Sequence, residues 1–169
     1  MKRFLRNLVL LAGVSFVLQY MWEAWQSPIF YGGPSGKHVT PPAHQGPGVE
    51  ILILATIGDV LMSVGLYVLL SLVNRDANWI AKKYGAKDWT IMVLYALFFS
   101  FYFETRGLST HRWGYSSLMP LFPGTNIGLV PVAQLLILFP LSFVLNRFII
   151  KLLDKSYSSN LGGRINVPR

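Results

Sequence analysis

Four apolar segments dominate this chain, and each contains at least one acidic or amide residue. The segments are residues 4–25, 50–73, 89–104 and 127–153. The key residue of each segment, in the same order, is Glu23, Asp59, Glu104 and Gln134. A charged side chain at the centre of a bilayer costs about 2.5–3.5 kcal/mol on insertion scales, so it usually faces the protein interior and has a partner there. The chain is therefore predicted to be an all-α bundle of four transmembrane helices with an internal polar pocket.

The composition supports the membrane class and excludes several others. Of the 169 residues, 53% are hydrophobic and only 13% are charged, which leaves no room for a soluble domain beside four spans. Residues 1–169 are thus expected to form a single transmembrane domain. The absence of cysteine excludes disulfides, thiolate nucleophiles and cysteine-rich zinc sites. The net charge of +8 is better explained by membrane topology than by nucleic acid, so no nucleic-acid partner is expected.

The distribution of basic residues predicts the orientation in the membrane. Most of them lie in the first six residues, in the connection 74–88 and after the fourth segment, whereas the loops 26–49 and 105–126 hold only Lys37, Arg106 and Arg112. The positive-inside rule then predicts that both termini are cytoplasmic and that both long loops are outside. The first segment begins like a signal peptide, but no small-residue cleavage site follows Leu18, so we expect it to remain as the first helix.

The polar residues are expected to lie at similar depths. At 1.5 Å per residue, Asp59 lies about 12 Å below the outer start of its helix and Gln134 about 10 Å below the start of its own. Glu23 and Glu104 come near the outer ends of their segments. All four are therefore predicted in the outer half of the bilayer. For Glu23 and Glu104 the alternative is a solvated position at the membrane interface.

Helical spacing places further small and polar residues on the same faces. Residues four apart share one side of a helix, as do Ser15, Gln19 and Glu23 in the first segment and Ala96, Ser100 and Glu104 in the third. In the second segment the corresponding face is expected to hold Ala55, Thr56, Asp59, Ser63 and Tyr67. Small and polar faces are usual helix-packing surfaces in lipid. Packing alone accounts for the serines and alanines, but it accounts poorly for a carboxylate such as Asp59.

Aromatic and basic residues accompany the acids at the outer level. Trp22 lies beside Glu23, and the second loop contains Arg112, Trp113 and Tyr115. We expect Trp113 and Tyr115 to form a lid over the pocket, although single aromatic residues at this depth also fit an interfacial belt. Arg112 or Arg106 could pair with a carboxylate. Alternatively, one crowded carboxyl keeps its proton.

Two other residue types have weaker implications. Pro131 and Pro140 are each expected to bend the last helix, because proline removes a helical hydrogen bond. The three histidines, His38, His44 and His111, match no metal-ligand spacing. Phosphate-cradling and nucleophile-elbow motifs are also missing from the sequence. No metal and no cofactor are therefore expected.

Several short motifs together resemble those of a family of small, four-span prokaryotic membrane proteins of unassigned function. The motifs are Trp22-Glu23 through Gln26, Gly58-Asp59-Val60, Glu104, Arg112-Trp113-x-Tyr115, Met119-Pro120 and Gly128-x-x-Pro131-x-x-Gln134. The resemblance covers most of the chain and implies fold, topology and a prokaryotic plasma membrane, but no activity.

A fainter similarity, limited to residues 104–134, links the chain to membrane lycopene cyclases and carotenoid hydratases. Those proteins also have an acid, an aromatic-x-Tyr element, and Gly and Pro opening a helix. The paired glutamates that follow this proline in the cyclases are replaced here by Val132, Ala133 and Gln134. The cyclase activity is therefore not carried over, but the similarity favours an isoprenoid-like or lipid ligand.

These observations lead to one main hypothesis and two alternatives. The main hypothesis is a pocket that binds or modifies a lipid or isoprenoid-like amphiphile. Its candidate catalytic acids are Asp59, Glu104 and Glu23. Its candidate ligand-binding residues are Arg112, Trp113, Tyr115, Gln134, Gln19 and Trp22. The second hypothesis is an accessory or assembly subunit, in which Asp59 pairs with a basic residue of another membrane protein or of a second copy. Proton or ion passage ranks last, because the cytoplasmic half offers only Asn146 and Ser71 as polar candidates.

Overall fold

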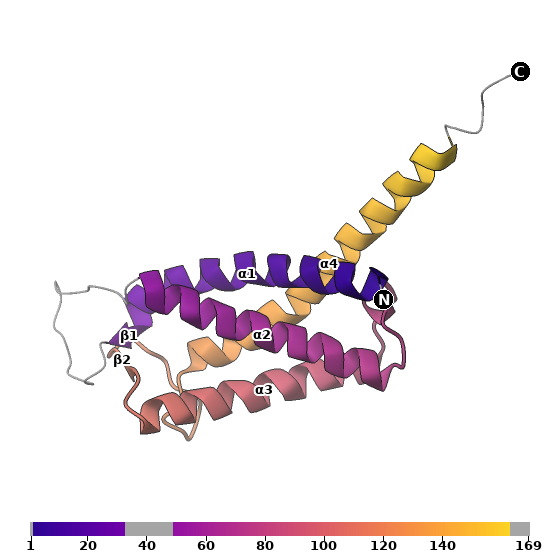
Figure 1. The fold of residues 1–169 in the computed structure, drawn as a ribbon. Coiled ribbons are helices and arrows are strands. Elements are labelled where there is room, and N and C mark those ends of the chain that lie inside the picture. The colour runs from indigo at the N-terminus through magenta and orange to yellow at the C-terminus, as the bar shows by residue number, and fades with distance from the viewer. Residues whose placement is uncertain (1, 33–48, 163–169) are drawn as a thin grey trace, which may run out of the picture.

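Four long helices form the bundle in the computed structural model, which describes residues 2–32 and 49–162 (Figure 1). The helices are α1 (Lys2–Phe30), α2 (Val49–Val73), α3 (Ala86–Ser109) and α4 (Leu129–Gly162). Each contains a stretch that is long and apolar enough to cross a membrane. The predicted all-α fold with four membrane-spanning helices is confirmed. The smaller elements are β1 (Tyr31–Gly32), the 3-10 turn η1 (Trp79–Ala81) and β2 (Gly114–Tyr115).

The helices extend past most of the boundaries that the sequence suggested. Helix α1 continues from Trp25 to Phe30, α3 runs from Ala86 to Ser109, and α4 continues past Leu153. Hydropathy marks only the part of a helix that suits hydrocarbon, whereas backbone hydrogen bonding continues into the polar ends. The predicted loop 26–49 therefore begins as helix. Most of that loop, including His38 and His44, lies outside the described residues.

Helix α1 packs against both α2 and α4, and α3 packs mainly against α4. Helices α2 and α3 contact each other little; they approach at the short connection 74–85 and diverge toward the opposite end (Figure 1). We call the end with the connection 74–85 the connection end, and the end where β1 and β2 lie the strand end. The distribution of basic residues predicts that the strand end faces outward.

A compact aromatic core occupies the connection end of the bundle. The Trp79 ring lies against Phe143, with 5.6 Å between ring centroids, and its Nε1 donates to Ser71 Oγ at 3.0 Å. The Tyr84 hydroxyl donates to the Phe143 carbonyl oxygen at 2.9 Å. Phe139 and Tyr67 are fully buried nearby. These contacts fix η1 and the connection against α2 and α4.

On α1, the face that packs against the other helices is largely polar, and apolar side chains point outward. The buried residues of α1 are Asn7, Leu11, Ser15, Gln19, Glu23, Gln26 and Ser27. Val9, Val17 and Met21 on the same helix are exposed. This inverted pattern is what lipid requires, since polar groups must be satisfied inside the protein. The predicted faces of α1 and α3 are confirmed.

Two expectations about helix detail need correction. On α2, Thr56, Ser63 and Tyr67 are buried as expected, but Ala55 is exposed. Pro131 was expected to bend the last helix, yet it is the third residue of α4. The first four N–H groups of a helix have no intrahelical acceptor, so Pro131 removes no hydrogen bond there. Only Pro140 lies in the helix interior.

Candidate functional site

A single glutamine side chain joins three helices near the strand end. The Nε2 atom of Gln134 on α4 lies 2.9 Å from Gln19 Oε1, 2.9 Å from Glu23 Oε1 and 3.0 Å from Asp59 Oδ2, so its two amide hydrogens are shared among three acceptors. Gln19 and Glu23 come from α1 and Asp59 comes from α2. Sequence analysis predicted that side chains of separate spans would meet here. In the structure, Gln134 is what brings Glu23 and Asp59 together.

Three further side chains of α1 complete this arrangement around Glu23. Gln26 Nε2 donates to Glu23 Oε1 at 2.9 Å and to Gln134 Oε1 at 2.6 Å, while Trp22 Nε1 donates to Gln26 Oε1 at 2.9 Å. Ser27 Oγ donates to Glu23 Oε2 at 3.2 Å. We call the set Gln19, Trp22, Glu23, Gln26, Ser27, Asp59 and Gln134 the glutamine–carboxylate cluster. Gln26 and Ser27 were not predicted as site residues, although their spacing of three and four residues from Glu23 was available as a signal.

Glu104 lies in a second set of hydrogen bonds, which we call the Glu104 cage. Tyr31 donates its hydroxyl to Glu104 Oε1 at 3.3 Å, and Trp113 Nε1 donates to Glu104 Oε2 at 3.3 Å. The Tyr115 hydroxyl also donates to Glu104 Oε2. It accepts a hydrogen bond from the Gly128 backbone N–H at 2.9 Å. The lid residues Trp113 and Tyr115 therefore contact the acid directly, and the cage consists of Tyr31, Glu104, Trp113 and Tyr115.

A minimal β-ribbon positions the two phenols of the cage. Strand β1 pairs antiparallel with β2 so that Tyr31 lies opposite Tyr115 and Gly32 opposite Gly114. Directly opposed residues of such a pair point to the same face, and the two tyrosine rings lie 5.8 Å apart. Ser116 extends the attachment, because its Oγ donates to the Ile29 carbonyl oxygen at 2.8 Å. The second loop is thereby fixed to the end of α1.

Two glycines allow the cage to close. A Cβ atom at Gly107 would lie 2.0 Å from Trp113 Cζ2, so only glycine lets the indole ring rest on α3 here. A Cβ atom at Gly128 would lie 3.0 Å from Tyr115 Cζ and 2.9 Å from Met119 Sδ. Real side chains essentially never approach so closely, and side-chain volume at either position would displace the aromatic rings. Neither glycine was predicted to matter for the cage.

The phenols of the cage stay protonated near neutral pH. Burial, followed by the negative charges of Glu104 and Glu23, raises the pKa of the Tyr31 phenol well above its ordinary value. Burial and the Glu104 carboxylate also raise the pKa of Tyr115. Both hydroxyls therefore remain hydrogen-bond donors. Tyr31 directly follows α1, four residues after Ser27, so the cage and the glutamine–carboxylate cluster are close neighbours.

No basic side chain balances the three acids within the described residues. The ion pairs there are Arg6–Asp154 and Lys82–Asp76, and neither involves Glu23, Asp59 or Glu104. Arg112 is exposed. Arg106 turns to Tyr102, to whose hydroxyl it donates at 3.0 Å. The expectation that an arginine would pair with an acid of the pocket is thus not met in this part of the chain.

The three acids differ in how well they are satisfied. Glu23 receives hydrogen bonds from Gln26, Ser27 and Gln134, and Glu104 receives three from its cage. Among the described residues, Asp59 receives only the hydrogen bond from Gln134. Asp59 is also partly exposed, whereas Glu23 and Glu104 are buried. Asp59 is therefore the acid with capacity left for another partner.

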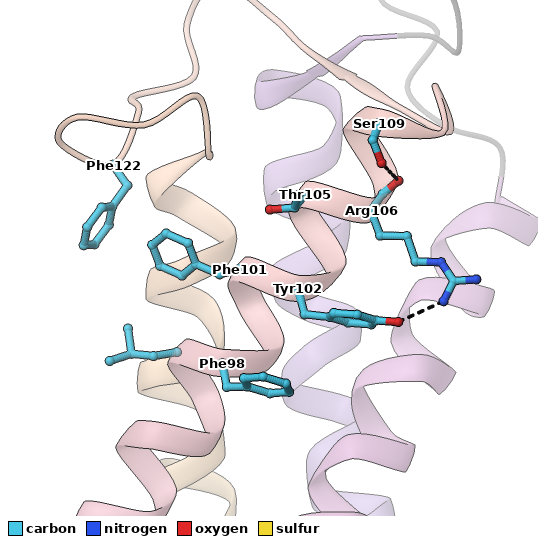
Figure 2. Close-up of a pocket in the computed structure, with 8 residues that line it drawn as sticks. Phe98, Phe101, Tyr102, Thr105, Arg106, Ser109 and Phe122 are labelled. Atoms are coloured by element: carbon cyan, nitrogen blue, oxygen red, sulfur yellow. Dashed lines mark hydrogen bonds between the residues drawn. The ribbon is translucent and has the colours of Figure 1, made fainter.

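An open groove of about 800 Å³ runs along the membrane-facing side of α3 (Figure 2). Its lining residues are Leu97, Phe98, Phe101, Tyr102, Thr105, Arg106, Ser109 and Phe122. Phe122 reaches α3 from the second loop, and its ring packs edge-on against Phe101 at 5.1 Å. The buried stripe of α3, which includes Ser100 and Glu104, lies on another face of the helix. The groove is thus apolar and separate from the acids.

The predicted site residues therefore fall into two adjoining groups and one outlier. Gln19, Trp22, Glu23, Asp59 and Gln134 share the glutamine–carboxylate cluster. Glu104, Trp113 and Tyr115 share the cage. Arg112 belongs to neither. Within residues 2–32 and 49–162, no three His, Asp or Glu side chains are grouped so as to hold a metal ion.

Fold and site together define a multi-pass α-helical membrane protein with a buried cluster of carboxyl and amide groups. No protein-family model, curated protein or solved structure matches this chain. Its function must therefore be argued from the site.

Proposed function

We propose that this protein binds a lipid or isoprenoid-like amphiphile and holds its polar end against Asp59 for proton transfer. The observation that carries the proposal is the unequal hydrogen bonding of three acids from three helices. Within the part of the chain that the structure describes, Glu23 and Glu104 each accept three hydrogen bonds, whereas Asp59 accepts one and is partly exposed. A ligand group that donates a hydrogen bond, carries positive charge or accepts a proton would satisfy Asp59.

The arrangement suits general acid–base chemistry or the stabilisation of a cation. A carboxyl within reach of a ligand can give or take a proton. Glu23 and Glu104 are fixed by their hydrogen bonds, so their oxygens would stabilise positive charge developing nearby without having to reorganise. Tyr31 and Tyr115 hold Glu104 in place as donors. In this proposal Asp59 is the reacting acid, and Glu23 and Glu104 stabilise charge beside it.

An amphiphile can approach Asp59 from within the bilayer. Helices α2 and α3 diverge toward the strand end (Figure 1). On α2, the exposed Ala55 lies one turn from the partly exposed Asp59. The aromatic groove on α3 offers a surface for an apolar chain at the same end of the bundle. Both features favour a ligand that has a polar end and a long apolar part.

Replacement of Asp59 by asparagine tests the proposal. Asp59→Asn keeps the shape of the side chain but removes the carboxyl, so the purified protein is expected to lose most of its copurifying amphiphile. Untargeted lipid analysis by mass spectrometry measures the retained ligand. Glu50→Gln is the matched control, because Glu50 is an exposed acid on the same helix. Equal retention by Asp59→Asn and the wild type would remove the basis of the proposal.

The second candidate function is that of an accessory or assembly subunit of a membrane complex. The partial exposure of Asp59 also suits a basic side chain of another chain or of a second copy. Crosslinking in native membranes separates the two readings. A stoichiometric crosslinked partner that is lost in Asp59→Asn favours the subunit, and copurified amphiphile without such a partner favours ligand binding.

We also propose that the protein resides in the plasma membrane of a prokaryote. The support is the resemblance of its motifs to those of small four-span prokaryotic membrane proteins, together with four helices that can cross a membrane. Fractionation of bacterial cells that express the chain checks this location. Recovery in the outer membrane or the soluble fraction would contradict it.

A further inference from the structure

Polar side chains line the contact between α1 and α4 well beyond the glutamine–carboxylate cluster. On α1 they are Asn7, Ser15, Gln19 and Glu23, and on α4 they are Gln134, Ser142 and Asn146; all are buried. Successive members on each helix are four or eight residues apart, so they share one face. From Asn7 to Glu23 the stripe covers about 24 Å of helix, against a hydrocarbon thickness of about 30 Å. We call this contact the polar seam.

Hydrogen bonds align the two halves of the seam at both ends. Asn146 Nδ2 donates to the Asn7 carbonyl oxygen at 3.2 Å, and Gln134 Nε2 donates to Gln19 Oε1 at 2.9 Å. The helices run antiparallel, and twelve residues separate the two contacts on each helix. Equal steps from these contacts therefore place Leu11 level with Ser142 and Ser15 level with Leu138. Every level of the seam then holds at least one polar side chain.

Polar atoms in the seam have unused hydrogen-bonding capacity. Gln19 Nε2, Ser142 Oγ and Asn146 Oδ1 are buried and have no hydrogen-bond partner within residues 2–32 and 49–162. A fourth buried oxygen, Asp76 Oδ2, lies outside the seam and is paired with Lys82 Nζ at 2.7 Å. A buried polar group without a partner costs about 1–3 kcal/mol, and internal water is its usual partner. Three such atoms along one contact indicate a shared cause.

The spacing of the levels matches single water molecules. Four residues of helix rise about 6 Å, and two successive hydrogen bonds through one water, at about 2.8 Å each, span nearly the same distance. Ser15 Oγ and Ser63 Oγ, 2.7 Å apart, supply two hydroxyls at the level of Leu138. We propose that the polar seam is a hydrated file that gives the carboxyl groups of Glu23 and Asp59 access to protons from the connection end. This access does not depend on which ligand meets Asp59.

Hydrogen–deuterium exchange of the Gln134 side-chain amide tests the proposal. In proteoliposomes moved into D2O, solid-state NMR is expected to show the Gln134 amide protons exchanging in the wild type. Ser142→Val replaces a hydroxyl of the seam by methyl groups and should slow this exchange at least tenfold. Leu138→Ser adds a hydroxyl at a level where α4 has none and should speed the exchange. The opposite signs keep the test decisive if one variant folds poorly.

Ser100→Ala is the matched control, because Ser100 is buried on α3 and its Oγ already donates to the Ala96 carbonyl oxygen. It should leave the Gln134 exchange rate unchanged. Unchanged exchange in Ser142→Val and Leu138→Ser would place the water route at the strand end and overturn the proposal, as would the absence of exchange in the wild type. Copurified amphiphile is measured on the same preparations, so a failure of the proposed function is visible separately.

Discussion

The two ends of the bundle differ in the kind of side chains that fill their interior. At the connection end, Trp79, Tyr84, Phe139 and Phe143 pack as an aromatic core, and the polar atoms of Trp79 and Tyr84 are hydrogen-bonded to Ser71 and to the Phe143 carbonyl oxygen. At the strand end, carboxyl and amide groups occupy the interior, and Asp59 accepts one hydrogen bond from the residues that the structure describes. Packing of large side chains gains dispersion energy, whereas burying carboxyls has a cost. The comparison predicts that the connection end contributes most to stability, whereas the proposed function depends on the strand end.

The largest expected effect comes from removing a core ring at the connection end. Phe139 is fully buried, so Phe139→Ala should lower the free energy of unfolding by about 3–5 kcal/mol through lost contacts and a cavity. Thermal or denaturant unfolding in detergent measures it. Phe98→Ala is the control, because Phe98 is 64% exposed on the membrane-facing side. Equal losses of unfolding free energy in the two variants would contradict the distinction between the buried core and the outward face.

A methyl group at Gly107 should disturb the Glu104 cage by steric overlap. Gly107→Ala places a Cβ atom 2.0 Å from the Trp113 ring, and such overpacking costs about 1–3 kcal/mol. We expect lower stability and loss of copurified amphiphile, since the ring must leave Glu104. Gly13→Ala, which meets nothing within 4 Å, should be neutral or slightly stabilising. Unchanged ligand retention in Gly107→Ala would show that the cage does not matter for binding.

Removing one hydroxyl from the cage should have a smaller effect. Tyr115→Phe deletes the group that accepts from the Gly128 N–H and donates to Glu104, at a cost of about 1.5 kcal/mol. Tyr20→Phe serves as control, because no hydrogen bond to the Tyr20 hydroxyl occurs within the described residues. Thermal or denaturant unfolding in detergent measures the loss of stability. If Tyr115→Phe lost no more unfolding free energy than Tyr20→Phe, the Tyr115 ring would contribute only by packing.

The smallest effect concerns pH and lies at the connection end. The hydrogen bond from Lys82 lowers the pKa of Asp76 below its model-compound value of 3.8. Because the folded-state pKa is the lower one, the pair stabilises the fold above about pH 4, and this contribution is lost as the pH falls through the folded-state pKa. The pair is largely solvent-accessible, so we expect less than about 1 kcal/mol. Unfolding of Lys82→Met between pH 3 and 6 measures it, with Lys83→Met as control. A pH dependence identical to that of the wild type would contradict the assignment.

Much of the fold and part of the site could be predicted from the sequence. Hydropathy located the four spans, and the four-residue spacing of Ser15, Gln19 and Glu23 predicted their shared buried face. That Glu23, Asp59 and Gln134 lie at similar depths was predicted from their positions along the helices. These inferences hold because polar residues of a membrane helix must face the protein interior, so their spacing in the sequence shows which face of the helix is buried.

The remaining features depend on contacts between distant parts of the chain. The β1–β2 pairing joins residues more than eighty positions apart through two short stretches with no strand pattern, so the role of Tyr31 was not predictable. The polar seam was not predicted, because the sequence does not show that Ser142 and Asn146 of α4 face the polar side of α1. Proton passage was ranked last because only Asn146 and Ser71 were counted as polar residues of the cytoplasmic half. The structure buries Asn7 and Ser142 as well, which weakens that argument.

The central claim is that Gln134 couples acids of separate helices, and a double-mutant cycle tests it most directly. Stability is measured for the wild type, Asp59→Asn, Gln134→Leu and the double variant under one set of conditions. Side chains in direct contact usually show interaction energies of about 0.5–3 kcal/mol, and we predict a value in this range. A second cycle that pairs Asp59→Asn with Phe98→Ala should be additive. Additivity in the first cycle as well would contradict the claim that Asp59 and Gln134 belong to one site.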